Sequence, residues 1–164
     1  MTLRFLALGT LAGLVAFAPM TLAQEAKIAF GDLAQDTSLP VEVTSETFSV
    51  NNADGTAVFS GDVRVTQGEM VLSATEVQVK YDPEGRAIQE LIAKGGVSVT
   101  NLGDRAQSAE AVYTIDTGVI VMTGNVVLSQ GPSSMQGQKL TINLKDGTGI
   151  MEGRVTTTFV PGGN

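Results

Sequence analysis

The sequence predicts an all-β protein in which repeated strand pairs stack into two facing antiparallel sheets. After residue 40, apolar and polar residues alternate with a period of two, and no segment shows the 3.6-residue period of a helix. Turn residues recur every 8 to 17 positions. A Gly-x-Val motif occurs four times, at spacings of 34, 29 and 29 residues: Gly61-Asp62-Val63, Gly95-Gly96-Val97, Gly124-Asn125-Val126 and Gly153-Arg154-Val155. Such recurrence is typical of stacked strand pairs that turn at equivalent places.

The first predicted strand pair lies at 41–50 and is interrupted near residues 44–46. A turn cluster at 51–55 precedes a strand at 57–66, and the chain turns again at 67–69. The next strand, 72–81, has a slip at Thr75-Glu76 that we interpret as a bulge changing the inward parity. Asp82-Pro83-Glu84-Gly85 then predicts a tight turn.

Two further units repeat this arrangement. The second has strands at 91–99 and 109–115 around a turn at 101–104, and in its last strand either Tyr113 and Ile115 or Val112 and Thr114 face inward. The third has strands at 120–128 and 135–144 around a turn at 131–134, before a turn at 146–149 and a last strand at 150–159. We expect the repeat glycines to allow a bulge or a positive φ where the strands bend.

The apolar residues of these strands are predicted to share one inward face. That face is either a closed core or a groove for lipid, and the small number of aromatic residues favours a lined rather than a filled interior. The candidate groove-facing residues are Ala57, Phe59, Val63, Val65, Leu72, Val77, Val79, Tyr81, Leu91, Val97, Val99, Ile120, Met122, Val126, Leu128, Leu140, Ile142 and Leu144.

Both ends of the predicted stack carry strands with little protection against further pairing. The candidate inter-subunit edge residues are Val41, Val43, Val155, Thr157 and Phe159. A heterologous contact between opposite ends would produce an open filament. The alternative is that the termini of the chain itself cover these edges.

The N-terminus resembles a secretory signal peptide. Arg4 precedes an apolar stretch of 14 residues, and Thr21-Leu22-Ala23 forms a small-x-small cleavage site. Because a bilayer span needs about 20 apolar residues, we prefer a cleaved leader to an uncleaved anchor. The predicted organisation is a signal peptide at 1–23, a partly mobile segment at 24–39, a β-domain at 40–161 and a tail at 162–164.

Composition excludes several classes of function. The chain has no Cys and no His, so thiolate or imidazole metal sites and a Ser-His-Asp triad are ruled out. The formal net charge of −7 leaves no basic surface for nucleic acid. Acidic residues lie mostly in turns, without the paired geometry of a glycosidase, so we expect no catalytic residues, no metal and no cofactor.

Three segments together resemble the OstA-like family. They are Ser60-Gly61-Asp62-Val63-Arg64-Val65-Thr66-Gln67-Gly68, its echo at 123–131, and the ending at 154–161. The resemblance implies an open β-jellyroll with two V-shaped sheets around an apolar groove. It implies head-to-tail stacking in the periplasm, with lipopolysaccharide passed along the groove by its acyl chains. The implied partners are an inner-membrane export complex with its anchored C subunit and an outer-membrane lipopolysaccharide translocon.

Two other functions remain open at this stage. The first is a self-assembling structural β-protein, which would have the same edges but a sealed interior and no lipid cargo. The second is the membrane-anchored C subunit of the same export system, which the cleavage site at 21–23 argues against. A solenoid-like sugar hydrolase or lyase is disfavoured by the positions of the carboxylates.

Overall fold

The computed structural model describes the chain at residues 26–29, 34–51, 53 and 55–160, with the side chains of 26–29 excepted. These residues form an all-β fold, as predicted, with no helix long and apolar enough to span a bilayer in the described ranges. The strands are β1 (Ala26–Ala29), β2 (Glu42–Thr44), β3 (Thr47–Asn51), β4 (Thr56–Gln67), β5 (Met70–Tyr81), β6 (Ile88–Asn101), β7 (Asp104–Thr114), β8 (Val119–Gln130), β9 (Ser133–Asn143), β10 (Thr148–Glu152) and β11 (Thr156–Thr158).

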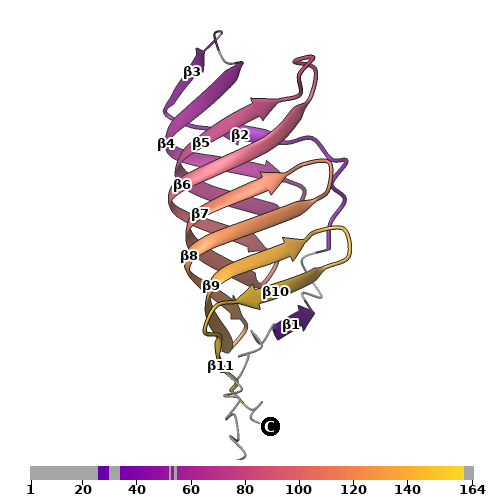
Figure 1. Ribbon diagram of the computed structural model, residues 1–164, viewed down its shortest axis with the longest axis vertical. Helices are drawn as coiled ribbons and strands as arrows, with labels where there is room; N and C mark the ends of the chain where they lie inside the picture. Colours follow the sequence, from indigo (N-terminus) through magenta and orange to yellow (C-terminus); the bar gives the residue numbers. More distant parts are fainter. Residues whose placement is uncertain (1–25, 30–33, 52, 54, 161–164) are drawn as a thin grey trace, which may run out of the picture.

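The two facing sheets are opposite halves of the same long strands. Hydrogen bonds follow the order β1-β10-β9-β8-β7-β6-β5-β4-β2, while β3 also pairs with β4 and β11 with β9. Each strand from β4 to β9 bends in its middle, at the left edge of Figure 1. Sheet A comprises β2, β11 and the halves joined by the turns near 68, 102 and 131. Sheet B comprises β3, β10, β1 and the halves joined by the turns near 84, 116 and 146.

The repeated Gly-x pairs form this bend. Both residues of each pair have a positive φ: 82° and 42° at Gly61-Asp62, and 86° and 50° at Gly124-Asn125. The pairs at 95–96 and 153–154 have the same conformation. A β-carbon at Gly124 would lie 2.7 Å from the β-carbon of Ala109 on the neighbouring strand. The repeat therefore exists because the corner needs left-handed backbone and close strand approach.

One extra residue in alternate strands keeps the apolar side inward in both sheets. In β4, residues 61 and 62 lie opposite residue 75 alone, and in β8 residues 124 and 125 lie opposite residue 138 alone. In β4, β6 and β8, the residues that face inward are therefore all odd-numbered or all even-numbered on both sides of the corner. In β5, β7 and β9, the inward-facing residues change between odd and even numbers at the corner. The predicted parity switch at Thr75-Glu76 is present, although the extra residues lie on β4 and β6 rather than on β5.

Two further expectations concerned the pairing of residues 41–50 and the inward-facing residues of β7. The strands expected to pair with each other at 41–50 do not do so, because β2 pairs with residues 64–66 of β4 and β3 with residues 56–60. In β7, Ala111 and Tyr113 are buried, whereas Val112 and Thr114 are only half-buried. Tyr113 therefore faces the interior, which decides the parity that the sequence left open.

The segment at 24–39, which we expected to be partly mobile, makes hydrogen bonds with the body in both of its described stretches, 26–29 and 34–39. Strand β1 pairs with β10, and the Gln35 amide donates to the Leu144 carbonyl at 2.8 Å. In Figure 1 this segment runs beside the strand-end turns, on the side away from the bend. The predicted signal peptide at 1–23 and tail at 162–164 lie outside the described residues.

Candidate binding groove

Most of the predicted groove-facing residues form a single interior face between sheets A and B. Sixteen of the 18 are at most 1% exposed, and they come from five of the six long strands, β7 excepted, and from the turn that follows β9. The two that differ are Phe59 and Tyr81. Phe59 is half-buried, with its ring centroid 4.7 Å from that of Phe48, which is 56% exposed. Tyr81 is 38% exposed and therefore lies outside the closed interior face that we expected it to share.

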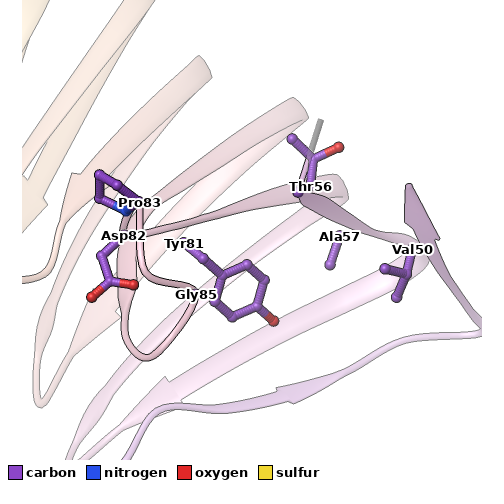
Figure 2. Close-up of a pocket in the computed structure, with 8 residues that line it drawn as sticks. Val50, Thr56, Ala57, Tyr81, Asp82, Pro83 and Gly85 are labelled. Atoms are coloured by element: carbon purple, nitrogen blue, oxygen red, sulfur yellow. The ribbon is translucent and has the colours of Figure 1, made fainter. Parts of the chain in front are cut away.

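Tyr81 instead lines a pocket of about 500 Å³ near the β2–β3 end of the stack. Figure 2 shows its ring directed toward the space next to Ala57 and Val50, beside the turn that carries Asp82. Ala57 is buried and Val50 is 56% exposed, so this pocket lies where the buried face meets the exposed surface of β3. Tyr81 is the last residue of β5 and lies beside the exposed Val50 at this end of the stack, so its side chain stays partly open to solvent.

Several interior residues were missing from the predicted set. Some follow the corrected parity and could have been found from it; these are Met70, Ala74, Ala93, Ala106, Ala111, Tyr113, Met135 and Met151. Gln67, Asn101 and Ser108 are buried polar residues, which a search for apolar periodicity cannot detect. Gln67 and Asn101 end the inward series of β4 and β6, so the apolar lining gives way to amides at the rim of sheet A.

The interior is closed in this conformation. A space lined by Val99, Ala106 and Leu128 of sheet A and by Ile142 of sheet B has no room for a water molecule. Across the interior, the Tyr113 hydroxyl donates to Gln67 Oε1 at 2.6 Å, which joins sheet B to sheet A. Burial raises the pKa of Tyr113 to about 12, so the phenol remains a hydrogen-bond donor at neutral pH.

The interior face is apolar and includes flexible methionine side chains. The four methionines beyond the predicted leader, Met70, Met122, Met135 and Met151, are all buried in it. Methionine adapts its shape more readily than branched side chains do. Charged residues lie outside: Lys139 pairs with Glu152 at 2.8 Å and Lys80 with Glu90 at 3.3 Å. The described residues contain no group of three carboxylates that could hold a metal.

Both ends of the stack expose strands, and these carry the predicted edge residues. In the described part of the chain, β2 pairs only with β4, and β11 only with β9. Val43 lies in β2 and Thr157 in β11, while Val41 and Val155 are half-buried against the core beside them. Phe159 is 74% exposed immediately after β11. At the same end, β1 covers the edge of β10.

Comparison with known proteins identifies a family that matches most of this sheet. The profile of the family described as "LptA/(LptD N-terminal domain) LPS transport protein" matches residues 42–148. The chain belongs to this family. The resemblance seen in the repeat motifs is thereby confirmed, and the matched range covers all strands from β2 to β9. The LptA/LptD N-terminal domain family is a family of transport proteins, so the comparison gives no support to the hydrolase alternative.

Relatives of known name cover most of the chain. It is 30% identical over 137 residues to the lipopolysaccharide export system protein LptA of Escherichia coli K12, covering 77% of this chain and 74% of that one. It is 25% identical over 156 residues to LptA of Haemophilus influenzae, covering 88% of each. The crystal structure of LptH from Pseudomonas aeruginosa, a periplasmic lipopolysaccharide-transport component, superposes with a TM-score of 0.68 at 18% identity. That match covers 77% of this chain and 99% of LptH, and it confirms the open jellyroll fold.

Proposed function

We propose that this chain is a periplasmic, non-enzymatic carrier that binds lipopolysaccharide by its acyl chains and passes it along the space between sheets A and B. Membership of a lipopolysaccharide-transport family supports the cargo. The observation that carries the mechanism is the interior face, which is apolar through all six long strands and includes no charged side chain among the described buried residues. An acyl chain gains about 0.8 kcal/mol for each CH₂ group it buries.

We further propose that the mature chain begins at Gln24, after cleavage of residues 1–23, and works by head-to-tail assembly. The exposed edges at β2, β3 and β11 support contacts with further copies and with the ends of the pathway. The proposed partners at the two ends of the pathway are the inner-membrane export complex with its anchored C subunit and the outer-membrane translocon. Because β1 covers β10, β11 offers the freer edge at that end.

Photo-methionine provides a direct test of the cargo. A chain that keeps only Met122, with the other interior methionines replaced by Leu, places one diazirine in the groove; such Met-to-Leu changes cost under about 1.5 kcal/mol each. Irradiation in cells should attach lipopolysaccharide to this chain. The control moves the single methionine to the exposed outer position Gln107, and it should give no lipid adduct.

The two outcomes separate the proposed function from its competitor. An adduct at Met122 and none at position 107 would establish acyl chains between the sheets. Folded, exported protein that yields no adduct at Met122 would contradict lipid carriage and favour the structural β-protein with a sealed interior.

Self-assembly depends on the β11 end in this proposal. Phe159→Glu should weaken self-association about tenfold or more, because an exposed aromatic ring would no longer be buried between copies. Sedimentation velocity measures the change. Leu102→Glu is the matched control, since Leu102 is 68% exposed in the β6–β7 turn, away from both edges. Equal weakening in both variants, or in neither, would contradict a contact through this end.

A further inference from the structure

A short segment before β2 bridges the open side of the V. Residues 34–40, which we call the strap, contact sheet B at Gln35. The backbone N–H of Gln35 donates to the Leu144 carbonyl at 2.8 Å. On the same side, the Thr37 methyl lies 3.0 Å from where a β-carbon at Gly118 would be. On the sheet A side, Leu39 Cδ1 lies 3.0 Å from where a β-carbon at Gly68 would be. The strap thus spans from the β4–β5 turn to the β7–β8 turn and the end of β9.

Gln67 holds the strap in this position. Its amide nitrogen donates to the carbonyl oxygens of Thr37 and Leu39, both at 2.9 Å. Its carbonyl accepts from the Tyr113 hydroxyl at 2.6 Å and, more weakly, from Gln35 Nε2 at 3.4 Å. A single buried amide, 1% exposed, therefore ties together the strap, sheet A and sheet B. The bond to Tyr113 is buried and those to the strap are part-buried, so each is stronger than it would be in open water.

The strap is the weakest element that closes the interior. In the described part of the chain, one backbone hydrogen bond joins it to the sheets, whereas neighbouring long strands share continuous ladders. Gln35 Oε1 is buried without a hydrogen-bond partner, a cost that release into water would remove. Met70 and Leu144, at the two rims, are fully buried. An acyl chain cannot pass between the rims while the strap lies across them.

We propose that the strap is a lateral gate, latched by Gln67 and Tyr113, which must lift from the Gly118 rim before acyl chains occupy the interior. This inference rests on the proposed lipid-carrier function and adds its regulation. When the gate is closed, the interior excludes both water and lipid. When cargo displaces the strap, the Gln67 amide and the Tyr113 hydroxyl become free at the rim, where they can bind polar groups next to an acyl chain.

An engineered disulfide tests the gate directly, because the chain contains no other cysteine. In Thr37→Cys/Gly118→Cys, the side chains are close enough for a disulfide that fixes the strap to sheet B. The probe is purified lipopolysaccharide with a fluorescent acyl chain. We expect the oxidised protein to take it up at least about tenfold more slowly than the same protein after reduction.

Each result of this experiment is informative. Equal, measurable uptake in both redox states would overturn the gate while leaving lipid carriage intact. No uptake in either state, with unmodified protein also inactive, would overturn the proposed function itself, and the gate with it. Because the two redox states are the same chain, strain introduced at position 118, where φ is +69°, affects both.

Loosening the latch is the complementary test. Gln67→Leu removes both donors to the strap, and uptake should become about fivefold or more faster, since each lost hydrogen bond shifts the open population several-fold. Hydrogen exchange at the Gln35 amide should rise in parallel, a change that general destabilisation of the strand ladders would not confine to the strap. Gln107→Leu on the outer face of β7 is the control. Unchanged exchange and uptake in Gln67→Leu would contradict the latch.

Discussion

Gly124→Ala is expected to lower the free energy of unfolding by about 2–5 kcal/mol, the combined cost of left-handed strain and overpacking. The backbone at Gly124 has a φ of +86°, and an added β-carbon would lie 2.7 Å from the β-carbon of Ala109. That methyl group is attached directly to the backbone and cannot rotate away. Chemical denaturation would measure the loss, which corresponds to a melting temperature lower by on the order of 10 °C.

Two further variants divide this cost into its causes. Ala109→Gly in the Gly124→Ala background removes the clash but keeps the strained φ, so it should recover only part of the loss. Gly103→Ala is the matched control, because Gly103 has open space around it and no positive φ. A Gly124→Ala protein as stable as the control would show that the corner does not need glycine.

Ile142→Ala is expected to cost about 2–5 kcal/mol without lipid and distinctly less when lipopolysaccharide is present. Ile142 is fully buried and faces Val99, Ala106 and Leu128 across the interior, so truncation opens an apolar cavity between the sheets. An acyl chain that enters this cavity replaces the lost carbons, each worth about 0.8 kcal/mol. Lipid should therefore stabilise the variant more than the unmodified protein.

Thermal unfolding with and without lipopolysaccharide measures this difference. Val127→Ala, a truncation on the outer face of β8, serves as the control and should lose little stability and gain nothing extra from lipid. If lipopolysaccharide stabilised Ile142→Ala no more than the unmodified protein, acyl chains would not reach the space beside position 142.

Local patterns were sufficient to predict much of this protein. Period-two alternation identified the long strands, and the recurring Gly-x-Val identified the corners, because positive φ at paired positions is a local backbone requirement that few sequences meet. The inward faces of β4, β6 and β8 followed directly, since their parity does not change at the bend. The family followed from the same repeats, which reflect the geometry of the corners.

The tertiary structure alone decided which contacts join distant segments. Tyr81 is partly exposed because it ends β5 beside the open end of the stack, and residues 41–50 divided between the two halves of β4. The buried amide of Gln67 is polar, so no apolar pattern marks it, and its partners Thr37 and Tyr113 lie far away in the chain. By itself, the sequence determined the strands and their corners, because these are local. The closure of the groove by the strap required the folded chain, because it depends on hydrogen bonds between elements that only the fold brings together.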